Sequence, residues 1–160
     1  MLRVTLFIVE TEPAMTEAKL KDQIRVDADI ADVWRFLADL RSWPSFVDNL
    51  ESWEPEGDWV SGVNRMGSGK RVAFEGKVVE RVFEERIVLE MQFPGTDGSS
   101  RITYHLEHGR GRRGTLVTEE LALRLKLSRP LGWLLRLLMR ITKPRGLSNL
   151  ARLKRVIEGR

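Results

Sequence analysis

The feature that most constrains the fold is a long stretch in which apolar and polar residues alternate. From Glu51 to Lys126 apolar and polar side chains alternate, so that each kind recurs at every second position. This is the period of a strand with one buried face. Polar and Gly-containing turns interrupt the alternation, so it predicts successive antiparallel strands joined by short loops. The expected inner faces are Val72, Phe74, Val78 and Val82; Ile87, Leu89, Met91 and Phe93; Ile102, Tyr104 and Leu106; and Val117, Leu121, Leu123, Leu125 and Leu127.

The segment before this stretch combines a strand with two short helices. Alternation predicts a strand over 20–27. A first helix follows with Asp29 as its expected N-cap, and its apolar face has the spacing i, i+3, i+4, i+7, at Ile30, Val33, Trp34 and Leu37. Ser42 is the expected cap of a second helix, because Pro44 is tolerated in a first turn. The apolar side of that helix would be Phe46, Val47 and Leu50.

After Pro130 the apolar period becomes helical again. The segment 131–160 predicts a long C-terminal helix, which Pro144 and Gly146 should kink or break. A curved sheet with one apolar face must be covered, and this helix is the only predicted element large enough to cover it. We therefore expect an α+β fold with an antiparallel sheet of about six or seven strands wrapped around a long C-terminal helix. The expected single domain spans 19–160, and 1–18 would be an N-terminal extension.

Charge is unevenly distributed along the 160 residues, whose net charge is +4. From Arg124 onward there are eleven Lys or Arg and a single acid, Glu158, so this part carries +10 and the remainder −6. A basic amphipathic helix with Arg136, Arg140 and Lys143 on one side can bind an anionic membrane or an acidic partner. The alternative is that the basic end folds back on the acidic body. Aromatic residues do not interleave with the basic ones, so we expect no nucleic-acid partner.

The residue types present also limit the chemistry. There is no cysteine, which excludes disulfides, thiolate nucleophiles and cysteine metal sites. His105 and His108 lie three apart in a predicted strand and should point to opposite faces, so we expect no metal site and no cofactor. No apolar run approaches the ~20 residues that span a bilayer, and the N-terminal apolar segment is too short for a secretory signal. We expect a cytoplasmic protein.

Four segments carry a resemblance to a known family. They are "IRVDADIADVWRFLADLRSWPSF" at the first strand and both helix entries, "GKVVERVFEERIVLEM" in mid-sheet, "GTLVTEELALRL" at the last strand and "LSNLARLKRVIEG" near the C-terminus. Over residues 20–158 the chain resembles the START/SRPBCC superfamily of birch-pollen-allergen-like, helix-grip proteins, and is most similar to its bacterial polyketide cyclase/dehydrase and lipid-transport branch. The resemblance implies a helix-grip fold. It does not choose among the cyclases, dehydratases, lipid binders and quinone binders of that superfamily.

In such an architecture the core and the wall of a ligand pocket are the same surface, and an apolar wall suits a hydrophobic ligand. One residue raises a separate question, because Trp43 can be a fixed wall or a movable gate. The expected ligand contacts are Trp34, Leu37, Trp43, Phe46, Phe74, Val78, Leu89, Met91, Tyr104, Leu121, Leu123, Trp133 and Leu138.

Three polar side chains share the apolar register and are the candidate catalytic groups. Tyr104, Glu80 and Glu119 would point into the cavity, where a buried carboxyl group suits proton transfer next to a carbonyl. The alternative is a strand end, a bulge or an ion pair with Arg that turns the carboxylates to solvent. Our first hypothesis is a protein that binds a hydrophobic small molecule such as a lipid, polyketide, isoprenoid or quinone. The second is a polyketide cyclase or dehydratase-type enzyme, and the third is membrane or partner docking through the basic helix.

Overall fold

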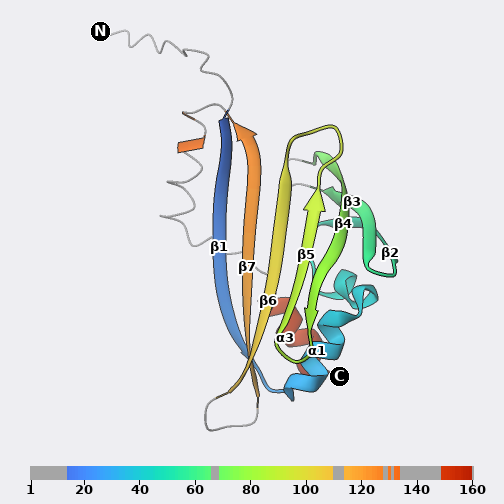
Figure 1. Ribbon diagram of the computed structural model, residues 1–160. Helices are drawn as coiled ribbons and strands as arrows, with labels where there is room; N and C mark the ends of the chain where they lie inside the picture. Colours follow the sequence, from blue (N-terminus) through green and yellow to red (C-terminus); the bar gives the residue numbers. More distant parts are fainter. Residues whose placement is uncertain are drawn as a thin grey trace, which may run out of the picture.

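The computed structural model describes residues 14–65, 69–109, 114–127, 130, 132–133 and 149–159. Its main element is a curved, seven-stranded antiparallel sheet with the order β1-β7-β6-β5-β4-β3-β2 (Figure 1). The predicted α+β class, with its curved sheet and helical C-terminus, is confirmed. The strands are β1 (Ala14–Val26), β2 (Leu50–Glu56), β3 (Trp59–Arg65), β4 (Arg71–Val82), β5 (Arg86–Gln92), β6 (Ser99–His108) and β7 (Thr115–Leu127).

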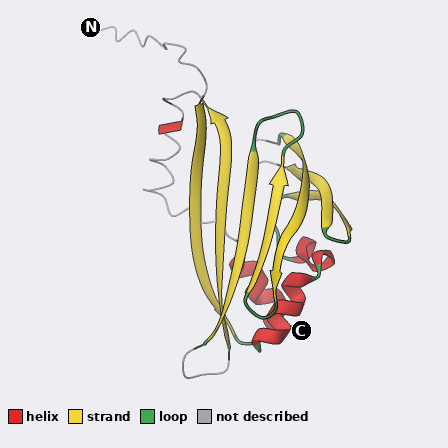
Figure 2. Cartoon of the chain, in the orientation of Figure 1, coloured by secondary structure: helices red, strands yellow, loops and turns green. Residues whose placement is uncertain are grey.

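The labelled helices lie toward one end of the sheet, the lower end in Figure 1 (Figures 1 and 2). The labelled helices are α1 (Ile30–Ala38) and α3 (Leu150–Glu158), and the 3-10 helix η1 (Leu40–Ser45) follows α1 in the chain. Most of the segment 131–148, where the sequence predicts a long helix with a break, lies outside the described residues. The C-terminal helix that the structure describes is the nine-residue α3, which begins after Asn149.

The first strand is longer than the alternation predicted. β1 begins at Ala14 rather than at residue 20, and it pairs with β7 residue by residue from Ala14↔Leu127 to Val26↔Thr115. Residues 14–18, expected in the N-terminal extension, therefore belong to the sheet, and 1–13 lie outside the described residues. The reason is geometric, because a 13-residue β7 presents backbone N–H and C=O groups that a shorter partner would leave unpaired.

The hydrophobic core lies between the inner face of the sheet and the three helices. In cross-strand pairs such as Leu89↔Ile102 and Leu106↔Val117, the side chains share this inner face. The apolar residues of the alternating stretch thus form one continuous surface. The buried members of the core are Val26, Ile30, Val33, Phe36, Leu37, Leu40, Trp43, Phe46, Val60, Phe74, Val78, Ile87, Leu89, Met91, Tyr104, Leu106, Val117, Leu150 and Leu153.

The α1 helix buries a face slightly rotated from the predicted one. Ile30, Val33 and Leu37 are buried as expected, but Phe36 is the fourth buried residue and Trp34 is only partly buried. Asp29 occupies the N-cap position, although its side chain makes no capping hydrogen bond. The sequence therefore placed the helix correctly and misjudged its inner edge.

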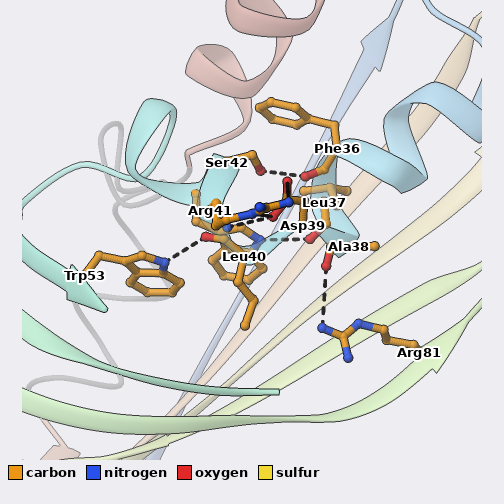
Figure 3. A network of polar contacts seen from close by, with 10 residues as sticks. Phe36, Leu37, Ala38, Asp39, Leu40, Arg41, Ser42, Trp53 and Arg81 are labelled. Carbon is orange, nitrogen blue, oxygen red and sulfur yellow. Dashed lines mark hydrogen bonds and ion pairs between the residues drawn. The ribbon is translucent and has the colours of Figure 1, made fainter. Parts of the chain in front are cut away.

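The last four carbonyl groups of an α-helix lack partners inside the helix. In α1 all four are satisfied, three of them by side chains (Figure 3). The bonds run to Arg35 O from Asp39 N at 3.2 Å, to Phe36 O from Ser42 Oγ at 2.5 Å, to Leu37 O from Trp43 Nε1 at 2.9 Å, and to Ala38 O from Arg81 Nη2 at 3.5 Å.

This arrangement corrects the predicted second helix. Asp39, not Ser42, caps η1, and its Oδ1 accepts from Arg41 N at 3.1 Å. The Ser42 hydroxyl is used instead to close the end of α1. Pro44 lies inside η1, as its tolerance predicted, but Leu50 begins β2 rather than ending the helix. The six residues of η1 are held against α1, because the side chains of Ser42 and Trp43 donate hydrogen bonds to carbonyl groups of that helix.

The α3 helix is held by polar contacts at both ends. Asn149 is its N-cap residue, and its side-chain Oδ1 accepts from Asp48 N at 3.0 Å. Toward the C-terminus, Glu158 Oε1 accepts from Asp27 N at 2.8 Å. Leu150 and Leu153 are buried between these contacts, so the short helix is fixed over the lower part of the inner face.

Gly62 permits a close approach in the strongly curved part of the sheet. A Cβ built on this glycine of β3 would overlap the carbonyl oxygen of Ser52 and come within 2.6 Å of the Phe74 ring. Phe74 is 1% exposed and packs against the core. The absence of a side chain at Gly62 therefore makes room for a core aromatic ring.

We predict that Gly62→Ala lowers the free energy of unfolding by about 1–3 kcal/mol, since the added methyl group has no space beside backbone and ring atoms. Denaturant unfolding measures the change. Ser61→Ala is the matched control, because Ser61 is exposed, and it should change stability by less than about 0.5 kcal/mol. Equal stability of the two variants would contradict the packing assigned to Gly62.

Candidate functional site

Two of the predicted polar residues form one buried pair. Tyr104 of β6 and Glu119 of β7 are directly opposite each other in the sheet. The Tyr104 hydroxyl donates to Glu119 Oε1 at 2.9 Å, and the backbone N–H of Asn149 donates to Glu119 Oε2 at 3.2 Å. Tyr104 is 1% exposed and Glu119 is 6% exposed. The pair is thus a polar point within an apolar interior.

The surroundings hold Tyr104 in its protonated form. Burial, together with the neighbouring Glu119 carboxylate that accepts its hydrogen bond, raises the pKa of Tyr104 well above its ordinary value. The phenol therefore acts as a hydrogen-bond donor toward Glu119 across the physiological pH range. In any proton transfer at this pair, the carboxylate is the group that can accept a proton.

Aromatic rings surround the pair. The Trp43 ring meets Tyr104 edge-on at a centroid distance of 5.6 Å, and the Phe46 ring lies 6.3 Å from Tyr104. Trp53 stacks on Trp43 at 5.5 Å with an interplanar angle of 13°, and Phe74 follows at 5.7 Å from Trp53. Edge-on and offset contacts of this kind stabilise aromatic clusters beyond their buried area. The rings give the pair a largely apolar environment.

The position of Trp43 favours a fixed wall over a gate. Its side chain is 1% exposed, and its Nε1 donates to the Leu37 carbonyl oxygen at 2.9 Å. Moving the ring would break this bond and leave a helix-terminal carbonyl without its partner. The tryptophan is therefore both a core residue and part of the α1 terminus.

The prediction that Glu80 points into the cavity is wrong. A β-bulge between Val78 and Glu80 shifts the alternation of β4 by one residue, so that Glu80 pairs with Val88. Residues beyond a bulge change face. Glu80 lies on the outer face of the sheet, where its side chain is 33% exposed and accepts a hydrogen bond from Arg86 Nε at 3.0 Å. For Glu80 the alternative given above therefore holds, because a bulge and an ion pair with Arg86 turn its carboxylate away from the interior.

The predicted apolar contacts fall into two groups along the inner face. Leu121 and Leu123 are only partly buried, and they pair with Ile102 and Ser100 beyond the core cluster. This second group extends the apolar face past the helices. The first group packs in the core with Tyr104 and consists of Leu37, Trp43, Phe46, Phe74, Val78, Leu89 and Met91.

Two predicted tryptophan contacts lie elsewhere. Trp34 is partly buried, meets Phe83 at 4.9 Å and donates from Nε1 to Val82 O at 2.9 Å, so it packs on the β4–β5 turn. Trp133 is 66% exposed, so the prediction that it faces inward is wrong. A Cβ added to the adjacent Gly132 would overlap Thr16 Oγ1, so this glycine approaches β1 closely. Leu138, Arg136, Arg140 and Lys143 lie outside the described residues.

Three residues of this region were not predicted as site residues. Trp53 joins the aromatic cluster, and its Nε1 donates to Leu40 O at 2.8 Å. Asn149 contributes its backbone N–H to Glu119, a contact that no side-chain pattern signals. Ser100 is 6% exposed although it follows a turn-like sequence, "PGTDGSS". Its place two residues before Ile102, in the apolar register, was the available signal.

Other features of the described residues do not compete with this site. A groove on the outer face of the sheet is lined mainly by charged side chains, several of which already form ion pairs, such as Lys21 with Glu120 at 2.9 Å. Within the described part of the chain, His, Asp and Glu do not gather in groups of three that could hold a metal ion. None of the helices seen there is long and apolar enough to cross a bilayer.

The pKa of Tyr104 predicts how stability depends on alkaline pH. Because the folded-state pKa is raised, tyrosine ionisation favours unfolding, and the free energy of unfolding should fall by about 1.4 kcal/mol per pH unit above pH ~10. Tyr104→Phe should lack this slope. It should also be less stable at neutral pH by about 1–3 kcal/mol, because Glu119 loses a donor. Denaturant unfolding at several pH values measures both effects.

The chain offers a direct check, because Tyr104 is its only tyrosine. Tyrosinate absorbance therefore reports this residue alone. It should titrate near pH ~10 in denaturant and stay absent in the folded protein until alkaline unfolding begins. Appearance of tyrosinate near pH ~10 in protein that is still folded would contradict the assigned environment.

Comparisons with known proteins agree with this architecture. The two-domain ARO/CYC StfQ of the steffimycin biosynthetic pathway aligns with a TM-score of 0.68 and 14% identity, over 90% of this chain and 51% of StfQ. A protein from Thermus thermophilus aligns with a TM-score of 0.66 and 20% identity, over 89% and 98%. Truncated norcoclaurine synthase from Thalictrum flavum gives 0.64 and 13%, over 92% and 97%. At these identities the likeness shows the fold.

Among curated proteins, none has a sequence that matches this chain significantly. The match to a family is nevertheless extensive. The family described as polyketide cyclase / dehydrase and lipid transport matches residues 17–158, which includes α3 and every described strand except the first three residues of β1. Together with the helix-grip neighbours, this confirms the resemblance to the START/SRPBCC superfamily. The chain belongs to the polyketide cyclase/dehydrase and lipid-transport family.

Proposed function

We propose that this protein binds a hydrophobic small molecule against the inner face of its sheet, beside the core cluster. The observation that carries the proposal is the continuation of the apolar face past the core. Leu121 and Leu123 stay partly buried, whereas Leu106 and Val117 at the helical end are 4% and 0% exposed. An apolar surface with a few convergent polar groups is typical of ligand sites.

The polar groups of this face support a ligand that carries oxygen functions. The Tyr104–Glu119 pair lies at the inner end, where the Tyr104 hydroxyl already donates a hydrogen bond to Glu119. A phenol oxygen and a carboxylate both accept hydrogen bonds, so this end suits a ligand hydroxyl group. The family and the ARO/CYC neighbours support a polyketide-like or lipid-like molecule as the class of ligand.

A test of binding places a charge on the proposed wall. Leu123→Glu should weaken the binding of the uncharged fluorescent probe N-phenylnaphthylamine at least about tenfold, because an unpaired carboxylate beside an apolar ligand is costly. Arg124→Gln is the matched control, since Arg124 is exposed on the opposite face, and it should bind the probe like the wild type. Fluorescence titration gives the affinities, and native mass spectrometry of the purified protein gives the molecule that it carries. Equal loss in both variants would refute the assigned face.

One observation favours an enzymatic role as the second candidate. A buried carboxylate next to a phenol is an arrangement that can move a proton beside a carbonyl group. The neighbours StfQ and BexL are named as ARO/CYC proteins of biosynthetic pathways. In this role Glu119 would accept the proton and Tyr104 would hold the carboxylate in place.

Hydrogen exchange of a simple ketone separates the two candidates. For an enzyme, the protein should accelerate the exchange of the methyl protons of acetylnaphthalene in heavy water, as followed by NMR. Glu119→Gln should then lower the rate about 10²–10⁴-fold, the usual contribution of a general base, while probe binding is kept. Thermal unfolding checks that the variant is folded. An exchange rate equal to that of buffer would leave binding as the function.

A further inference from the structure

Ser100 is a buried polar residue whose hydroxyl has no hydrogen-bond partner in the described part of the chain. Its side chain is 6% exposed, and the Oγ atom itself is buried. Buried hydroxyl groups are nearly always hydrogen-bonded, because leaving one unpaired costs free energy. Alanine would fill almost the same space without that cost, so the folded chain alone does not account for the serine.

The register places Ser100 on the inner face of the sheet. It lies opposite Met91 of β5 and Leu123 of β7, and both of these side chains are apolar. Ile102 and Tyr104 follow on the same face, since side chains of a strand alternate. The hydroxyl therefore sits within the apolar surface where the ligand is proposed to bind, between Met91 of the core cluster and Leu123.

The spacing to the second polar point is set by the strand. Ser100 and Tyr104 are four residues apart on β6, which corresponds to about 13 Å along the strand. On the inner face of β6, the apolar side chain of Ile102 lies between these two polar groups. A molecule that covers this distance would meet one polar contact near each end and apolar surface in the middle.

We infer that the Ser100 hydroxyl binds an oxygen atom of the ligand and thereby sets the position of the ligand along β6. The inference rests on the proposed function. The ligand class is an elongated or polycyclic apolar molecule with a carbonyl or hydroxyl oxygen at the Ser100 end. A serine hydroxyl rotates and can donate to a carbonyl, whereas the Tyr104–Glu119 end offers acceptors. The two ends therefore recognise different groups, which orients the ligand.

The test compares two probes that differ by one carbonyl group, acetylnaphthalene and ethylnaphthalene substituted at the same ring position. Ser100→Ala should weaken the binding of acetylnaphthalene about three- to tenfold, the usual effect of one hydrogen bond, and leave ethylnaphthalene unchanged. Ser99→Ala is the matched control, because it makes the same chemical change one residue away on the opposite face. It should bind both probes like the wild type.

Thermal unfolding without ligand gives a second, independent measurement. Since the hydroxyl is unpaired, Ser100→Ala should unfold at the same temperature as the wild type or at a higher one. A clear decrease would show that the hydroxyl supports the fold, and the inference would be overturned. A second result would also overturn it. If the wild type bound both probes and Ser100→Ala showed the same ratio of affinities for acetylnaphthalene and ethylnaphthalene, the hydroxyl would not recognise the carbonyl group. Failure of the wild type to bind either probe would instead refute the proposed function itself.

Discussion

The Glu119 carboxylate is the group on which the inner end of this structure depends, because a charged group inside a protein must be hydrogen-bonded. Its donors include the phenol of Tyr104 on the next strand and the N–H of Asn149 at the start of α3. Asn149 in turn accepts from the N–H of Asp48, in the connection between η1 and β2. One buried carboxylate thus fixes the sheet, the C-terminal helix and that connection in a single geometry.

The sequence predicted the parts of this structure that follow from local burial. The inner-face residues predicted at Ile102, Tyr104 and Leu106 all lie in β6, and the five predicted from Val117 to Leu127 all lie in β7. Alternation records directly which side chains meet the core, so it finds strands well. The same signal placed Tyr104 and Glu119 on one face, where the structure brings them together.

The sequence could not predict features that depend on distant partners. The bulge after Val78 moves Glu80 to the outer face, and nothing in the alternation of β4 marks it. The cap of η1 and the role of Trp43 depend on carbonyl groups exposed at the end of α1. Trp133 was predicted to contact the ligand, yet its side chain is exposed, and the adjacent Gly132 is the residue that approaches Thr16 closely. In each case a tertiary contact decided what a local pattern left open.

The two ends of the inner face therefore differ in what they contribute, the helical end to stability and the other end to the proposed ligand binding. At the helical end, aromatic rings and the Glu119 network are closely packed, and a substitution there affects stability first. At the other end, Ser100 and Leu123 pair with each other on the same face, four residues along each strand from Tyr104 and Glu119. Under the proposed function, substitutions at these two positions alter which ligand oxygen is recognised without disturbing the Glu119 network. A fold built in this way can change its ligand while it keeps its core, which explains how one architecture serves both binding proteins and enzymes.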